Sequence, residues 1–253
     1  MELFHKMISA ALNISEKQIN NTLNLLKDGA TIPFISRYRK EVTGGLDEVQ
    51  IENIKNQYDK LCETAKRKET ILSTISEQGK LTAELQKRID DTWDTTELED
   101  IYLPYKPKRK TRAEAARQKG LEPLAVTLML QRENNLEAKV GSFVKGDVKT
   151  IEDALKGARD IIAEQVNEDE RARNAIRNQF SRQAVISAKV VKGKEEEAAK
   201  YRDYFEFSEP LKRCTSHRLL AIRRAESEGM LKVSISPDDE ECIERLERQF
   251  VRS

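Results

Sequence analysis

The feature that most constrains the fold is a narrow stripe of apolar residues between Asp47 and Gly79. These residues recur at alternating spacings of three and four, which is the period of one face of an α-helix. Asp47 is a suitable N-cap, so we expect a long helical arm over about residues 47–78 that packs against one or two neighbours. Lys68 occupies the one stripe position that is not apolar. The positions expected to point inward are Ile51, Ile54, Tyr58, Leu61, Ala65, Leu72 and Ile75.

Composition favours long helices with solvated faces over a β-rich fold. The 10 glycines and 6 prolines are too few for a turn-rich sandwich or barrel, and aromatic residues, at 6% of the chain, argue against a surface rich in stacking rings. Charged residues make up 35%, but 45 Lys and Arg balance 44 Asp and Glu, so net self-repulsion does not keep the chain unfolded. We predict a mainly all-α fold, an elongated multi-helix bundle with one or two short strands at the C-terminal end.

Targeting signals and cysteine pairs are not evident. No stretch approaches the roughly 18 consecutive apolar residues of a membrane helix, and the first residues lack the basic and apolar regions of a signal peptide. Cys62, Cys214 and Cys242 are far apart, without metal-ligand or redox spacing. These features predict a cytoplasmic location and no membrane partner.

The N-terminal part has clear helix punctuation. Ser15 begins a capping-box pattern and Gly29 follows the expected helix end. We expect a bend over residues 31–35 and then a short basic helix over residues 37–40. Together they form a helix-turn-helix-like part over about residues 15–41.

The middle of the chain combines an acidic segment with a basic one. Trp93, the single tryptophan, lies among the acids of residues 90–100 and is expected to anchor a core. Two prolines in residues 103–112 disfavour a helix there and predict an extended basic arm. Further helices are expected over residues 112–119, 123–130, 150–166 and 216–228.

The C-terminal part contains one strand pattern. Residues 231–235 alternate apolar and polar side chains, but the chain offers this strand no evident partner. Asp238 is expected to cap a final amphipathic helix. We predict an N-terminal helical region over residues 1–190 and the start of a central region over residues 191–253.

No residue set predicts catalysis. The two histidines, His5 and His217, lack metal-ligand partners at helical spacing, and no glycine-rich phosphate loop occurs. The acid clusters at 90–100 and 238–247 are typical of helix caps and solvated faces. We therefore predict no catalytic residue, no metal, no cofactor and no enzymatic activity.

Three basic clusters are the candidate binding sites. Extended or helical runs of Lys and Arg suit phosphates, because contact with them releases counterions. For the extended arm over residues 103–112 the alternative is a solvated loop, or a strap that forms salt bridges across residues 90–100. The clusters are Arg37, Arg39 and Lys40 around Tyr38; Lys106, Lys108, Arg109, Lys110 and Arg112; and Lys212, Arg213, Arg218, Arg223 and Arg224.

Within the third cluster the arginines differ. Arg223 falls inside the apolar arc of its helix, so we expect it to be ion-paired, since an unpaired buried charge is costly. Arg218 and Arg224 point outward and are the better binding candidates.

Several segments closely resemble the bacterial Tex family over about residues 5–235. Ala225 is a departure, because members usually have Gly after the arginine, which bears on a close backbone approach at this turn. The matching segments are 31–48 (TIPFISRYRKEVTGGLDE), 98–109 (LEDIYLPYKPKR), 120–125 (GLEPLA), 200–205 (KYRDYF) and 216–218 (SHR).

The resemblance implies a cytoplasmic nucleic-acid-binding protein that is associated with transcription and is related to a eukaryotic transcription elongation factor. Family members continue from a helical region into a resolvase-like domain, helix-hairpin-helix elements and an OB-fold that provides much of the RNA binding. We expect this chain to hold only the N-terminal region, so no residue of those later domains is carried over. The strand at 231–235 would then open the next part of the protein.

These observations predict the non-catalytic helical scaffold of a Tex-like transcription accessory factor. The proposed contacts are sequence-independent, between the basic clusters and the backbone of RNA or DNA. One alternative is a protein-interaction scaffold that docks on the transcription machinery or on the missing domains, without nucleic-acid binding of its own. A more distant alternative is a nuclease whose active site lies in the missing resolvase-like domain.

Overall fold

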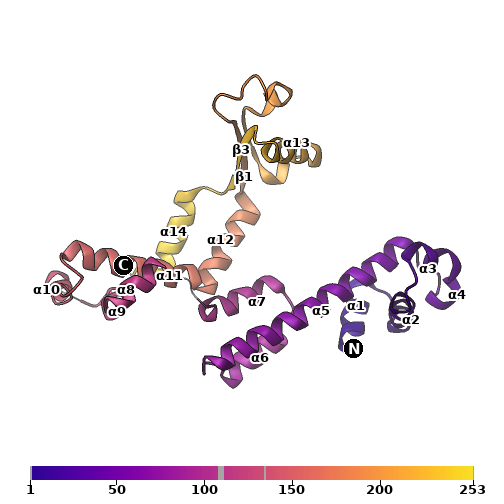
Figure 1. The fold of residues 1–253 in the computed structure, drawn as a ribbon, viewed down its shortest axis with the longest axis horizontal. Coiled ribbons are helices and arrows are strands. Elements are labelled where there is room, and N and C mark those ends of the chain that lie inside the picture. The colour runs from indigo at the N-terminus through magenta and orange to yellow at the C-terminus, as the bar shows by residue number, and fades with distance from the viewer. Residues whose placement is uncertain (1, 108–110, 134, 253) are drawn as a thin grey trace. The chain divides into compact units, whose positions relative to one another are not determined.

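The computed structural model describes residues 2–107, 111–133 and 135–252, and it separates the chain into two compact units (Figure 1). Unit 1 ends at Lys106 and unit 2 begins at Pro107. The prediction of a mainly helical fold is confirmed. The division after Lys106 separates compact parts of the chain, and the boundary between family regions expected at residue 190 stays a prediction.

Unit 1 is helical throughout its described part. Its helices bury two apolar clusters, one around Ile19, Ile35 and Ile51 and the other around Ile71 and Ile89. The elements are α1 (Glu2–Leu12), α2 (Glu16–Lys27), α3 (Ile32–Tyr38), α4 (Lys40–Thr43), α5 (Glu48–Glu77), α6 (Ala83–Asp91), α7 (Thr95–Tyr102) and the 3₁₀ turn η1 (Leu103–Tyr105).

The long helix α5 begins where the sequence predicts. The Asp47 side chain accepts a hydrogen bond from the backbone N–H of Gln50, which completes a capping box. The stripe shifts by one position in its second half, where Thr64 and Ile71 are buried in place of Ala65 and Leu72. The two halves of α5 pack on different neighbours, since Ile51, Ile54 and Leu61 belong to one cluster and Ile71 and Ile75 to the other, so the buried face changes along the helix.

Lys68 is buried in this stripe and makes polar contacts there. Its Nζ donates a 2.7 Å hydrogen bond to the Asp90 carbonyl near the end of α6 and lies 3.7 Å from the centroid of the Trp93 ring. Burial is the main cause that lowers the pKa of Lys68, against the opposing charges of Asp90 and Asp91. Trp93 also packs edge-on against Phe4, which agrees with its expected anchoring role.

Three local predictions in unit 1 are wrong. Residues 37–40 are not one short helix, because Arg39, with φ −133° and ψ 28°, separates α3 from α4. Residues 31–35 do not form a bend, because Thr31 caps α3 and Pro33 lies in its first turn, where a missing N–H costs nothing. Residues 103–105 are not extended, because Pro104 again sits at a turn start and continues α7 into η1. A proline marks a helix start as readily as a break.

Unit 2 combines helices with a small sheet. Its largest helical cluster lies around Leu121, Leu124 and Ile161. The elements are α8 (Arg112–Gln118), α9 (Glu122–Leu130), α10 (Leu136–Gly141), α11 (Ile151–Glu168), α12 (Glu170–Gln183), β1 (Val185–Val190), η2 (Ala199–Tyr204), β2 (Glu206–Pro210), η3 (Leu211–Arg213), α13 (Ser216–Ser227), β3 (Leu231–Ser236) and α14 (Asp239–Phe250).

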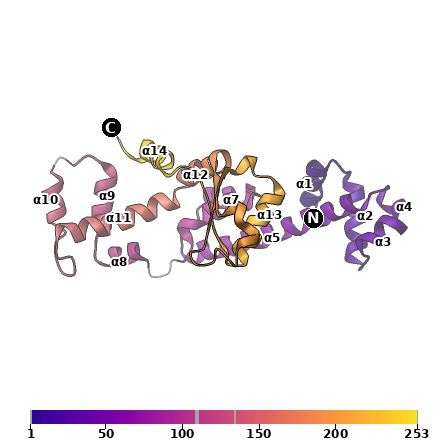
Figure 2. The ribbon, with the colours of Figure 1, turned by 90° about the horizontal axis from the view of Figure 1, so that it is seen from above.

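Helices α8 and α9 both pack on α11, which Figure 2 shows between them. Gly157 of α11 makes this packing close: a Cβ at this position would lie 2.3 Å from Leu121 Cδ1 and 3.3 Å from the Ala116 Cβ. Leu121 is itself buried. The glycine is therefore a packing position, not a helix end.

The sheet corrects the expectation of an unpartnered strand near residue 231. In the described part of the chain three antiparallel strands lie in the order β2-β1-β3, and Val190 pairs with Leu231. Ile186 and Ala188 of β1 face a core that α13 covers. Ala225 lies inside α13, buried in this core, so the position is a helix interior and not a turn.

Candidate nucleic-acid interface

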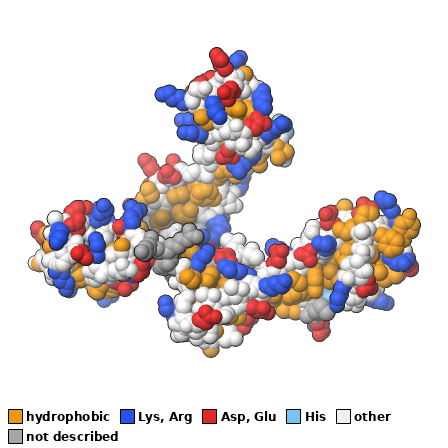
Figure 3. All heavy atoms as spheres, viewed as in Figure 1, with side chains coloured by type: hydrophobic (Ala, Val, Ile, Leu, Met, Phe, Trp, Pro, Cys, Tyr) orange, Lys and Arg blue, Asp and Glu red, His pale blue; other side chains and the backbone are white. Residues whose placement is uncertain are grey.

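One surface of unit 1 combines exposed rings with basic side chains; we call it the α3–α4 patch. Figure 3 shows hydrophobic side chains gathered at the end of unit 1 that carries these helices, with Lys and Arg among them. The short helices are joined at Arg39, which ends α3 and precedes α4. The patch consists of Phe34, Arg37, Tyr38, Arg39 and Lys40.

The two aromatic rings of the patch lie next to each other. Phe34 and Tyr38 are one helical turn apart, with ring centroids 5.4 Å apart and an interplanar angle of 43°. Phe34 is 40% exposed and Tyr38 is 64% exposed. The Arg39 guanidinium carbon lies 5.3 Å from the Phe34 ring centroid, which is within cation–π range.

The cations of the patch are accessible. Arg37 lies 3.5 Å from Glu48, but its side chain remains largely exposed, so this ion pair is screened by water. Arg39 donates to the Tyr38 carbonyl, a bond that leaves its charge uncompensated. Lys40 is exposed at the start of α4. The structure thus brings the first basic cluster together on one surface.

The second basic cluster divides between the two units. Lys106 is exposed at the end of unit 1, and Arg112 begins α8 in unit 2, where its largely exposed side chain lies 3.8 Å from Asp160. Lys108, Arg109 and Lys110 lie outside the described residues. Arg112 is therefore helical and not part of an extended arm.

Two acids of residues 90–100 have local partners. Glu99 receives two hydrogen bonds from Arg67 of α5, at 2.5 and 3.0 Å, and these bonds lower the pKa of Glu99. Asp94 caps α7, and hydrogen bonds from the Glu97 and Thr96 backbone contribute to lowering its pKa. Both carboxylates thus have a structural role.

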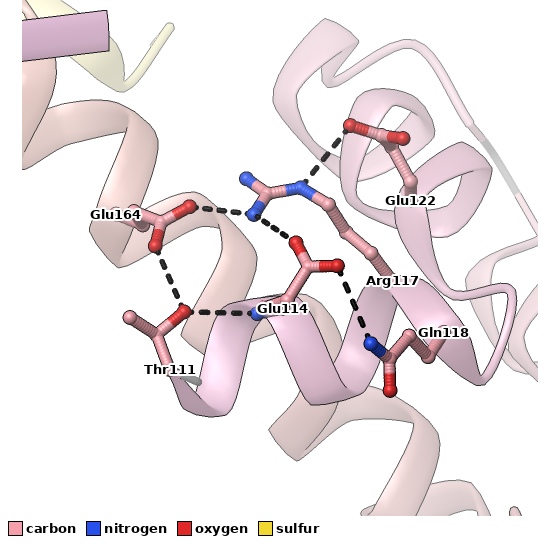
Figure 4. Close-up of polar contacts among 6 residues, drawn as sticks. All are labelled: Thr111, Glu114, Arg117, Gln118, Glu122 and Glu164. Atoms are coloured by element: carbon pink, nitrogen blue, oxygen red, sulfur yellow. Dashed lines mark hydrogen bonds and ion pairs between the residues drawn. The ribbon is translucent and has the colours of Figure 1, made fainter. Parts of the chain in front are cut away.

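A polar network around Arg117 fixes α8 to α11, as Figure 4 shows. Arg117 lies 2.6 Å from Glu164, 3.4 Å from Glu122 and 3.7 Å from Glu114. The Thr111 hydroxyl donates to Glu164 and accepts from the Glu114 backbone N–H, so it caps α8. Burial acts to lower the pKa of Arg117, but the bond to Glu164 and the nearby carboxylates outweigh it and raise that pKa.

The third cluster carries its own acidic partners. Arg218 donates to Glu209 at 2.9 Å. Arg223 pairs with Glu226 as expected, but its side chain is exposed, so its expected place inside the buried apolar arc is wrong. Arg224 donates to Glu228 at 3.1 Å. The outward arginines 218 and 224 stay candidates, each beside a carboxylate.

Glu228 neutralises more than one cation. It accepts from Lys200 at 2.8 Å and from the Tyr201 hydroxyl at 2.9 Å, in addition to Arg224. These hydrogen bonds, led by that from Lys200, lower the pKa of Glu228 to about 2. The carboxylate is thus ionised at neutral pH, and it weakens the local attraction for phosphate.

The described residues assemble no group of three or more His, Cys, Asp or Glu side chains that could hold a metal. Over the same ranges, no helix is both long and apolar enough to cross a bilayer.

Sequence reasoning overlooked the contribution of Phe34. The sequence predicts a bend over residues 31–35, so the helical relation of Phe34 to Tyr38 is not evident from it. The low aromatic content also argues against a stacking surface. The available signal was the spacing of two aromatic residues by four positions beside three cations.

Two compact units, a small antiparallel sheet in the second and separate basic clusters define the chain as a mainly helical protein region with local patches of exposed cations. Residues 2–76 match the family model described as the Tex-like protein N-terminal domain, and residues 131–252 match the Tex central region-like model. The chain belongs to the Tex family and carries its N-terminal and central regions.

Relatives with similar sequences are much longer than this chain. The transcriptional accessory protein Tex of Neisseria gonorrhoeae is 41% identical over 248 residues, which are 97% of this chain and 33% of that protein. Protein YhgF of Escherichia coli is 44% identical over 93% of this chain and 31% of its own length. S1 RNA-binding domain-containing protein 1 of Homo sapiens is 31% identical over 92% of this chain and 24% of its own length. The chain thus spans about a third of its bacterial relatives.

Proposed function

We propose that this chain is the non-catalytic scaffold region of a transcription accessory factor and that it contacts the backbone of nucleic acid. The name of the gonococcal relative supports the role in transcription. The observation that carries the nucleic-acid contact is the α3–α4 patch, where the exposed cations Arg37, Arg39 and Lys40 lie next to exposed Tyr38 in the chain. The proposed role in transcription supports a cytoplasmic location. The exposed cations of the patch support RNA or DNA as the partner.

The contact is with phosphates and is independent of sequence. Arg37, Arg39 and Lys40 lie on the short helices α3 and α4 and their junction, which suits contact with the phosphate backbone better than base reading by a longer helix. Lys106 and Arg112, with Lys108, Arg109 and Lys110 between them, add a second set of cations. Arg218 and Arg224 contribute less, because Glu209 and Glu228 compensate them.

The test is a titration of the chain with labelled RNA and DNA at two salt concentrations. Affinity should fall as salt rises, with a slope of roughly one per phosphate contact. A variant with Arg37→Glu, Arg39→Glu and Lys40→Glu should bind at least tenfold more weakly. The matched control, Lys66→Glu, Lys80→Glu and Lys87→Glu, reverses three exposed charges elsewhere in unit 1. Equal loss of binding in both variants would refute a role for the patch.

A second candidate function is a docking scaffold, which an apolar groove in unit 2 favours. The groove, about 620 Å³, lies among α11, α12 and α14 and is lined by Val166, Ile176, Phe180 and Leu246. No residue of α14 is buried, although its sequence is strongly amphipathic, and Figure 3 shows hydrophobic surface over α12 and α14. Because the bacterial relatives are about three times longer, the occupant we propose is the remaining part of a full-length Tex-family chain.

This second function has a direct test. The chain is mixed with a protein consisting of the C-terminal two thirds of the E. coli relative, and complex formation is measured by ultracentrifugation. Leu246→Asp should abolish the complex, whereas Leu220→Asp, at an exposed position on α13, should not. Absence of a complex with the unmodified chain would exclude this occupant.

A further inference from the structure

We propose that the α3–α4 patch recognises single-stranded nucleic acid by stacking an unpaired base on Tyr38, with Phe34 beside it. This inference rests on the proposed function and adds to it a preference for unpaired strands. Phosphate contacts alone do not distinguish an open strand from a duplex. A ring that meets the face of a base does, because base faces are hidden within a duplex.

The ring of Tyr38 is open to water on a protein surface where aromatic residues are scarce. Tyr38 is 64% exposed, more than the other exposed aromatic residues of the described chain, Phe180 and Phe34, at 41% and 40%. Phe34, the neighbouring ring, is also exposed rather than used in the core. Exposed aromatic pairs bury much surface when a flat ligand covers them, at little cost in side-chain entropy.

The helix that carries the rings is formed before any ligand arrives. Thr31 caps α3 through the Phe34 backbone N–H, and the Arg39 backbone N–H bonds the Ile35 carbonyl at 3.0 Å, which closes the last turn. Arg39 also lies over the Phe34 ring. With Phe34 partly covered by this guanidinium, Tyr38 is the ring more open to a base.

The surrounding charge favours a nucleic acid over an apolar protein partner. Arg37, Arg39 and Lys40 flank Tyr38 in the sequence, while the acids nearby are Glu41 on α4 and Glu48, which faces Arg37. Cations outnumber acids in this patch. A single strand presents what this arrangement fits, namely phosphates for the cations and an open base face for the ring.

The experiment compares three ligands of equal length: an oligothymidylate, the same strand with abasic sites in place of bases, and a duplex. We expect the 253-residue chain to bind the oligothymidylate most tightly. Tyr38→Ala should weaken binding to the oligothymidylate about 5-fold or more, the range for loss of one stacked base, and leave binding to the abasic strand unchanged. Tyr38→Phe keeps the ring and should bind as the unmodified chain does. Leu3→Ala, at an exposed position on α1, is the control.

The outcomes separate this inference from the proposed function. If charge reversal at Arg37, Arg39 and Lys40 weakens binding but Tyr38→Ala affects both strands equally or neither, phosphate contact stands and stacking is overturned. If neither variant changes affinity, the proposed function fails as well. An unchanged circular dichroism spectrum and melting temperature exclude loss of structure as the cause. If Tyr38 contacts only a protein, Tyr38→Ala changes binding to neither strand, which is the first outcome.

Discussion

Replacing Arg117 with Met should destabilise unit 2 far more than its single lost charge suggests. The side chain is 19% exposed and its partner Glu164 is 14% exposed, so their ion pair is mostly shielded from water. Methionine fills similar space but leaves the carboxylates of Glu164, Glu114 and Glu122 without their common cation. The Thr111 hydroxyl still donates a hydrogen bond to Glu164.

The size of the effect follows from the degree of burial. Breaking a fully buried ion pair costs about 3–5 kcal/mol, whereas exposed pairs contribute about 0–1 kcal/mol. The Arg117 network is near the buried end of this range, so we expect a loss of about 2–3 kcal/mol. Arg159, which pairs with Glu152 on the same helix α11, is the matched control, because these side chains are 64% and 72% exposed. Arg159→Met should cost less than about 1 kcal/mol.

Hydrogen exchange measures this effect where it arises. Protection of the α8 and α11 amides reports on unit 2, while fluorescence of the single tryptophan, Trp93, reports on unit 1. The Arg117→Met variant should lose protection in α8 and α11. Adding Glu164→Gln should cost less than the sum of the two single substitutions, since both remove the same interaction. Equal effects of Arg117→Met and Arg159→Met would refute the reasoning.

Three further predictions concern packing and pH. Gly157→Ala should destabilise the chain by about 1–2 kcal/mol in denaturant unfolding, because the added methyl overlaps a buried leucine and this outweighs the gain in helix propensity, whereas Gly141→Ala, which meets no atom within 4 Å, should be neutral or stabilising. The pKa of Lys68 is lowered in the folded chain, so the unfolded chain binds this proton more tightly. The free energy of unfolding of unit 1 should therefore rise as pH increases toward 10.5. Lys68→Met should flatten this rise in melts followed by Trp93 fluorescence. The pKa of Glu228 is lowered from 4.5 to about 2, so its contribution to stability is complete above pH 4.5 and is lost as pH falls through 2. Glu228→Gln should reduce the acid sensitivity of hydrogen exchange in α13 over that window. An unchanged pH profile would count against the network.

Local signals in the sequence determined several helix starts. Ser15, Asp47 and Asp238 each cap the helix that the sequence predicts, because a cap depends on a side chain and the backbone two or three residues later. The stripe of α5 and the helices over residues 112–119, 123–130, 150–166 and 216–228 follow from local periodicity in the same way. The resemblance to the Tex family also rests on sequence alone, and the family matches confirm it.

Tertiary structure decided the sheet, because strand pairing joins distant residues. Val185–Val190 lies in a segment that reads as basic and acid-free, and it becomes a central strand through partners at 206–210 and 231–236. The strand at 231–235 could not be given a partner until β1 was recognised.

Charge compensation was likewise decided by the fold. In the sequence the cluster from Lys212 to Arg224 has no acid, yet in the structure Glu209 and Glu228 reach Arg218 and Arg224. The three cations near Tyr38 keep their exposure, and Phe34 joins them only because residues 32–38 are helical. The order of residues sets where the cations lie along the chain. The folded structure sets which of them face a carboxylate, because electrostatic interaction depends on distance in space and not on distance along the chain.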